Sequence, residues 1–66
     1  MNMKLKLART AKNMSQQQLA DAVGVSRQTI GLIEKQKFNP SINLCINIAL
    51  ALDTTLDDLF WEVSHD

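Results

Sequence analysis

Residues 15–35 decide the fold, and they read SQQQLADAVGVSRQTIGLIEK. Ser15 and Gln18 have the spacing of a capping box, in which a hydroxyl and an amide each satisfy a backbone N–H at the start of a helix. Gly24 can take the left-handed conformation that ends a helix, and Ser26 can cap a second helix two residues later. The stretch therefore predicts two helices joined by a tight turn, over residues 16–23 and 27–35.

Start and stop signals on both sides of this pair predict three more helices. Asn39-Pro40 marks a turn, Ser41 can cap the helix that follows it, and Thr55 can cap a short last helix. The additional segments are residues 4–13, 42–52 and 56–59. Apolar residues recur at helical spacing, so we expect an all-α fold with one small core. The expected core is Leu5, Ala8, Leu19, Ala20, Val23, Val25, Ile30, Ile33, Phe38, Ile42, Cys45, Ile48, Ala49, Leu52, Leu56 and Leu59.

The two ends of the chain leave one alternative open. Met1, Met3, Leu5 and Leu7 alternate with polar residues, which is the period of a strand rather than of a helix. The alternative is a short β-ribbon in which this segment pairs with Phe60–Ser64.

The chain has 66 residues, of which 45% are hydrophobic and 21% charged, as is typical of one small globular domain. We expect residues 1–66 to form that domain. A core of this size supplies only roughly 3–5 kcal/mol, so further stabilisation is expected. One cysteine, Cys45, and one histidine, His65, cannot form an internal disulfide or a zinc site, and no cofactor is implied. A second subunit is the remaining candidate.

Membrane association and export are not expected. No apolar run approaches the ~20 residues of a membrane-spanning helix, and the first residues lack the apolar region of a signal peptide. We therefore expect a cytoplasmic protein with no membrane partner.

Charge is divided along the chain although the net charge is zero. All seven lysines and arginines precede residue 40 with only two acidic residues, which gives this part a net charge of +5. The remainder carries five acidic residues and no lysine or arginine, a net charge of −5. This asymmetry favours a basic face for a polyanion and an acidic end turned away from it.

The helix predicted over residues 27–35 has one face suited to a DNA groove. If Ile30 and Ile33 point inward, a rotation of about 100° per residue turns the other side chains outward. The outward residues are Gln28, Gly31, Leu32 and Lys35, with Arg27 beside them at the helix start. Gln28 suits adenine, Arg27 suits guanine or a phosphate, and Leu32 suits a thymine methyl. Gly31 costs about 1 kcal/mol within a helix, and its missing side chain leaves room for a base edge or the DNA backbone.

Five separated motifs occur together in the sequence. They are MSQQQLA at residues 14–20, GVSRQTI at 24–30, Ile33-Glu34, Asn39-Pro40-Ser41 and Leu59-Phe60. In this order and spacing they resemble the phage repressor/Cro type of helix-turn-helix regulator, the xenobiotic-response-element type, in its compact stand-alone form. The resemblance covers nearly the whole chain.

This resemblance implies a five-helix bundle that binds a palindromic operator of double-stranded DNA as a homodimer. It implies that Gln16 contacts a phosphate and braces Gln28. The residues implied at the DNA are Ser26, Arg27, Gln28 and Thr29, and those implied on backbone phosphates are Gln36, Lys37 and Asn39. A buried ion pair between Arg9 and Glu34 is implied within the fold. Because Ala8, Gly31 and Leu32 depart from the family pattern, the operator sequence does not follow from the resemblance.

The segment 42–52 predicts self-association. Nine of its eleven residues are apolar, so it has more apolar surface than one small core can cover. We expect a two-fold dimer whose contact includes Leu44, Ile46, Leu50, Phe60, Trp61 and Val63. An alternative for Trp61 is that it covers the core of its own subunit.

These observations predict a sequence-specific transcriptional regulator, and a repressor in particular. Nucleophile–base pairs, glycine-rich phosphate loops and metal-ligand clusters are absent from the sequence, so we expect neither an enzyme nor a metal site, and no small-molecule effector is evident. Two alternatives remain: an antitoxin that regulates its own promoter, and a protein-interaction module that has lost DNA binding. Cys45 is expected in the core, with a redox-sensing thiol as the alternative.

Overall fold

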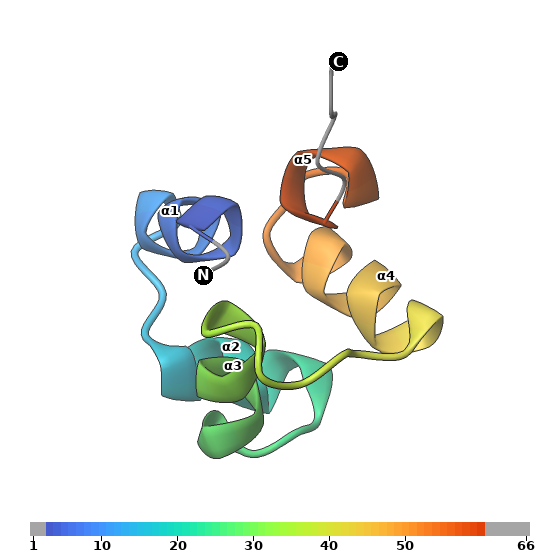
Figure 1. Cartoon of the computed structure of the whole chain (residues 1–66). Coiled ribbons are helices and arrows are strands. Elements are labelled where there is room, and N and C mark those ends of the chain that lie inside the picture. The colour runs from blue at the N-terminus through green and yellow to red at the C-terminus, as the bar shows by residue number, and fades with distance from the viewer. Residues whose placement is uncertain (1–2, 61–66) are drawn as a thin grey trace.

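The computed structural model describes residues 3–60, which form five helices and no strand (Figure 1). The helices are α1 (Met3–Ala11), α2 (Gln16–Val23), α3 (Arg27–Glu34), α4 (Ile42–Ala51) and α5 (Leu56–Phe60). The predicted all-α fold is therefore confirmed. In Figure 1, α2 and α3 lie together at the bottom of the molecule, and α5 lies at the opposite end.

Side-chain caps start four of the helices at the predicted residues. Ser15 and Gln18 form the complete capping box at the start of α2, with bonds of 3.0 and 2.8 Å. The hydroxyl of Ser26 accepts from the backbone N–H of Thr29 at 3.2 Å. Ser41 and Thr55 make the same bond at the starts of α4 and α5. Because each cap satisfies a backbone donor that the helix leaves unpaired, the helix boundaries follow from the sequence.

Left-handed residues follow the ends of the first four helices. Gly24 ends α2 with a φ of 79°, a conformation that glycine adopts without steric cost. Three residues with side chains adopt a similar φ of 55–60° after α1, α3 and α4, namely Asn13, Gln36 and Asp53. After α3, the N–H of Lys37 donates to the carbonyl of Leu32 at 2.8 Å, which is the closing bond of a Schellman motif.

One core joins all five helices. Its side chains are at most 5% exposed, and they are Leu5, Leu19, Ala20, Ile30, Ile33, Ile48, Ala49, Leu52 and Leu59. Ala8, Val23, Val25 and Leu56, also predicted for the core, are partly buried and pack against it, and Cys45 is 8% exposed. Two predicted core residues are exposed instead: Phe38 is 45% exposed and Ile42 is 70% exposed. Phe38 lies in the connection after α3. Ile42 is displaced by about 100° around α4 from the stripe centred on Ile48 and Leu52, so it faces away from the core.

The alternative β-ribbon at the chain ends is not formed by the described residues. Met3 and Phe60 both belong to helices, so the segment that starts at Met3 is helical rather than extended. The remaining residues of that alternative, 1–2 and 61–64, lie outside the described part of the chain. Within residues 3–60, every helix is too short or too polar to cross a bilayer.

Candidate nucleic-acid interface

The helix α3 divides its side chains between the core and the surface as predicted. Ile30 is fully buried and Ile33 is 2% exposed, and both pack in the core. Gln28 and Lys35 are exposed, and Leu32 is 39% exposed. Since the buried pair anchors α3 on the bundle, the polar side of the helix is presented to solvent in a fixed orientation.

The start of α3 is organised by its cap. The hydroxyls of Ser26 and Thr29 are 3.0 Å apart, and Ser26 also accepts from the Thr29 backbone. Ser26 is exposed and Thr29 is half-buried. Both residues therefore stabilise the first turn of α3, and this turn carries the exposed side chains of Arg27 and Gln28.

A shallow hollow runs along the outer side of α3. Its volume is about 270 Å³, and it is lined by Gln16, Arg27, Gln28, Gly31, Leu32 and Lys35. A β-carbon built on Gly31 lies 3.8 Å from Nε2 of Gln16, an ordinary contact distance. Glycine is thus not required there for the fold, and its absent side chain deepens the hollow between α2 and α3.

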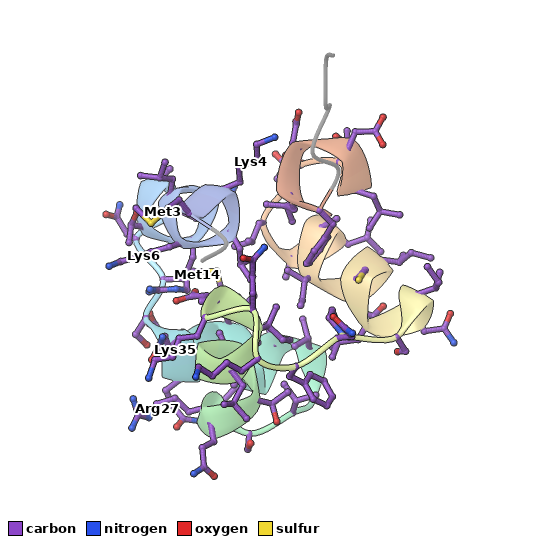
Figure 2. The ribbon with its side chains drawn as sticks, viewed as in Figure 1. Met3, Lys4, Lys6, Met14, Arg27 and Lys35 are labelled. Atoms are coloured by element: carbon purple, nitrogen blue, oxygen red, sulfur yellow. The ribbon has the colours of Figure 1, made fainter. Side chains whose placement is uncertain are left out.

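A second hollow, of about 260 Å³, adjoins the first where α1, α2 and α3 meet. Lys6 and Lys35 line it together with Arg9, Gln16, Gly31 and Glu34. Figure 2 shows Lys6, Lys35 and Arg27 on the same side of the molecule. No local motif in the sequence indicates Lys6, because its place in the same hollow as Lys35 depends on how α1 packs against α3.

The ion pair expected between Arg9 and Glu34 is present. Nε of Arg9 lies 2.8 Å from Oε2 of Glu34, and Nη2 of Arg9 lies 3.5 Å from Oε1. Nη1 of Arg9 donates to the carbonyl of Met14 at 2.8 Å. Arg9 is 8% exposed and Glu34 is 5% exposed. The pair therefore joins α1 to α3 in the interior, so Arg9 serves the architecture of the bundle.

Gln16 connects this ion pair to the surface. Its Nε2 donates to Oε1 of Glu34 at 3.0 Å, and its Oε1 accepts from Nη1 of Arg27 at 3.3 Å. The bracing of Gln28 by Gln16 is not seen in this structure without DNA, where Gln16 bonds Glu34 and Arg27, and it stays a prediction for the DNA-bound protein. The side chain of Gln28 is exposed and makes no hydrogen bond to a residue in the described range.

The other predicted DNA contacts lie in the connection between α3 and α4. Gln36, Lys37 and Asn39 are all exposed there, directly after the end of α3. The left-handed Gln36 reverses the chain, so this group is placed at the opposite end of α3 from Arg27.

Only part of the surface predicted for self-association is exposed on α4. Ile46 is 39% exposed and Leu50 is 72% exposed, as an interface requires. Leu44 and Phe60, by contrast, are half-buried and pack against the core of their own chain. Ile42 is exposed where Leu44 was expected to be, and Ile42, Ile46 and Leu50 form an exposed stripe at four-residue spacing. Trp61 and Val63 lie outside the described residues.

Cys45 belongs to the core side of α4. It is 8% exposed, and burial raises the pKa of its thiol above the ordinary value of 9.0. A raised pKa disfavours the reactive thiolate, which agrees with the expected packing role.

Comparisons with known proteins match the sequence and the fold. The helix-turn-helix family model matches residues 5–59. An HTH-type transcriptional regulator of Methanocaldococcus jannaschii is 45% identical over 60 residues, which cover 91% of each chain. The regulator YgzD of Bacillus subtilis is 39% identical, with 92% of each chain covered. The crystal structure of the restriction-modification controller protein C.AhdI from Aeromonas hydrophila is similar, with a TM-score of 0.83, 36% identity and 89% of each chain covered. The chain thus belongs to the helix-turn-helix family of Cro/C1 type.

Proposed function

We propose that this protein is a transcriptional regulator that places α3 in the major groove of double-stranded DNA. The observation that carries the proposal is the division of α3: Ile30 and Ile33 are buried while Arg27, Gln28, Leu32 and Lys35 face outward. An α-helix fits the major groove, where each base pair presents a distinct set of donors and acceptors. From here on, α3 is called the recognition helix.

Each outward residue has a chemical role in this proposal. The amide of Gln28 can bond adenine in a bidentate manner, the Arg27 guanidinium can bond guanine or a phosphate, and Leu32 can contact a thymine methyl. Ser26 and Thr29 lie at the helix start, where a phosphate is favoured by the macrodipole. The residues proposed for backbone phosphates are Gln16, Lys35, Gln36, Lys37 and Asn39.

The proposed assembly is a homodimer on a palindromic operator. A stripe of exposed apolar residues, consisting of Ile42, Ile46 and Leu50, lies on α4 and not on the recognition helix. A second copy covers this stripe most simply, because a two-fold contact uses the same surface on both subunits. The two recognition helices then enter successive major grooves ~34 Å apart.

Repression is the regulatory outcome that we propose. The chain provides a small DNA-binding unit, and a dimer bound across a promoter excludes polymerase by occupying the site. The names of the relatives as transcriptional regulators and of C.AhdI as a controller protein support a role in gene control. Such a regulator acts in the cytoplasm.

Selection of bound sites from a random pool of DNA duplexes tests this function. We expect an enriched palindrome whose half-sites are about 10–10.5 base pairs apart, centre to centre. Affinity for that site should fall steeply with salt, because lysine and arginine release counterions from the duplex. A pool that yields no enriched sequence, together with salt-insensitive binding to any duplex, contradicts the proposal. An enriched site without two-fold symmetry contradicts the homodimer alone.

A further inference from the structure

Four side chains form a continuous polar path from the interior to the proposed DNA surface. Arg9 binds Glu34 at 2.8 Å, Glu34 accepts from Gln16 at 3.0 Å, and Gln16 accepts from Arg27 at 3.3 Å. We call this path the relay. It starts at two residues that are less than a tenth exposed and ends at an exposed arginine on the recognition helix. The buried ion pair is thereby connected to a proposed DNA contact.

The chemistry of the two ends leaves one orientation for the Gln16 amide. An ionised Glu34 carboxylate only accepts hydrogen bonds, so it must face the NH₂ group of the amide. An arginine only donates, so Arg27 must face the amide oxygen. Among uncharged side chains of this length, glutamine alone offers a donor to one end and an acceptor to the other. A glutamate at this position repels Glu34, and a lysine repels Arg27.

We propose that Glu34 is a positioning residue for DNA recognition, which acts through Gln16 to hold the Arg27 guanidinium ready for its base or phosphate. The proposal rests on the proposed function of the recognition helix. Glu34 is suited to this task because Arg9 and the core hold it in place. Its carboxylate therefore keeps the amide of Gln16 in one position. The consequence is that a residue inside the protein affects discrimination between DNA sequences without touching DNA.

Holding Arg27 in this way preserves its capacity to bind DNA. The guanidinium has five N–H donors, and Gln16 uses one of them, on Nη1. The remaining donors can form a bidentate pair with guanine or a phosphate. Arginine loses considerable rotamer freedom when it is ordered, so an arginine that is already held in the free protein binds with a smaller entropic penalty.

The first test uses the free protein and needs no operator. Gln16→Met keeps the side-chain length and the Arg9–Glu34 pair but breaks the relay in the middle. The matched control is Gln17→Met, because Gln17 lies on the same helix and donates only to Asp21, at 2.8 Å on the exposed side. We expect the NMR order parameter of the Arg27 Nε–H group to fall in Gln16→Met and to be unchanged in Gln17→Met. Equal values in all three proteins overturn the proposal.

The second test removes the origin of the relay. Arg9→Met/Glu34→Met replaces both charges with apolar side chains and leaves neither charge unpaired. We expect this folded variant to loosen Arg27 as Gln16→Met does, and a rigid Arg27 in it overturns the role of Glu34. If the variant does not fold, exchange of the side-chain amide hydrogens in the wild type decides the matter. Slower exchange at Gln16 than at Gln17 supports the proposal, and equal exchange overturns it.

The third test measures DNA discrimination on the selected operator. The base pair read by Arg27 is the one at which Arg27→Ala reduces preference most. We expect Gln16→Met to reduce preference there by roughly 5-fold or more in the wild type, and to cause no further loss when it is added to Arg27→Ala. If Gln16→Met and Arg27→Ala reduce the preference by independent factors that multiply, the proposal is overturned. If the wild type prefers no sequence, the function proposed for the recognition helix is wrong. The NMR tests still show in that case whether Gln16 and Glu34 hold Arg27.

Discussion

Arg9 and Glu34 bring a guanidinium and a carboxylate to 2.8 Å inside the bundle, and this contact joins α1 to the recognition helix. The two charges satisfy each other, and Arg9 also bonds the carbonyl of Met14. No buried side-chain nitrogen or oxygen of the pair thus lacks a hydrogen-bond partner, which a buried ion pair requires if it is not to destabilise the fold.

Breaking the pair on one side should be far more harmful than removing it. We expect Arg9→Met to lower the free energy of unfolding by about 3–5 kcal/mol, because it leaves the Glu34 carboxylate buried and unpaired. Arg9→Met/Glu34→Met should recover most of that loss. Urea denaturation followed by circular dichroism measures both. Lys12→Met is the control, since Lys12 and Asp53 are exposed and 3.9 Å apart, and it should change stability by less than about 0.5 kcal/mol. A double variant as unstable as the single one contradicts this reasoning.

The two glycines should respond to alanine in opposite directions. At Gly24 the φ of 79° disfavours any side chain although the space is open, so Gly24→Ala should cost about 1–2 kcal/mol. Gly31 is helical and a β-carbon has room there, so Gly31→Ala should add about 1 kcal/mol to stability. Thermal denaturation measures both changes.

The same Gly31→Ala variant should weaken DNA binding, because its methyl group fills the hollow on the recognition helix. Titration of the selected operator with the variant and the wild type checks this expectation. A variant that is more stable and binds DNA at least as tightly shows that the hollow does not receive DNA.

Gln28 and Lys37 should differ in what they contribute to binding. We expect Gln28→Ala to lose about 1–3 kcal/mol on the operator and to relax preference at one base pair. Lys37→Ala should weaken binding to every sequence alike and reduce the salt slope by about 1. Binding isotherms on operator variants at several salt concentrations separate the two patterns. A uniform loss for Gln28→Ala would refute its proposed contact with a base.

Charge on the α4 stripe should prevent self-association. Leu50 is 72% exposed, and Leu50→Glu should raise the dissociation constant of the dimer at least about 10-fold, which corresponds to about 1.4 kcal/mol. Leu7→Glu provides the control, because Leu7 is 62% exposed but belongs to α1. Sedimentation equilibrium at micromolar concentrations gives the constants. A monomeric wild type, or equal effects of both substitutions, contradicts the proposed interface.

Loss of the Cys45 thiol proton should lower the free energy of unfolding in alkaline solution. Burial raises the pKa of this thiol in the folded protein above the ordinary value of 9.0, so the folded state retains its proton at a pH where the unfolded chain has lost it. The contribution is complete below pH 9 and is lost as the pH rises towards the folded pKa. Urea denaturation at pH 8 and at pH 10 should show that the free energy of unfolding decreases less between the two for Cys45→Ala than for the wild type. Equal decreases contradict this assignment.

Local signals predicted the helices well because each start depends on side chains close in sequence. Ser15, Ser26, Ser41 and Thr55 cap the helices at the predicted residues. The inward turn of Ile30 and Ile33 was equally predictable, since only one side of α3 is strongly apolar. Periodicity was less informative for α4, where apolar residues occur all round. It therefore could not determine that Leu44 packs inward and Ile42 faces solvent.

The side-chain contacts at the site that could not be predicted from the sequence are contacts between different helices. The contact between Gln16 and Arg27 joins residues of two helices, and its existence depends on the angle at which α2 meets α3. Lys6 lines the same hollow as Lys35 only because α1 packs against α3. The Arg9–Glu34 pair was foreseen only through the family resemblance, because neither residue carries a local signal for the other.

The separation of charge along the molecule has a kinetic consequence. Arg27, Lys35 and Lys37 lie on or directly after the recognition helix, whereas Asp57 and Asp58 lie on α5 at the opposite end of the bundle (Figure 1). The molecule therefore has an electric dipole despite its zero net charge. Near a duplex, the field of the phosphates exerts a torque that rotates α5 away, so a larger share of collisions begins in the productive orientation.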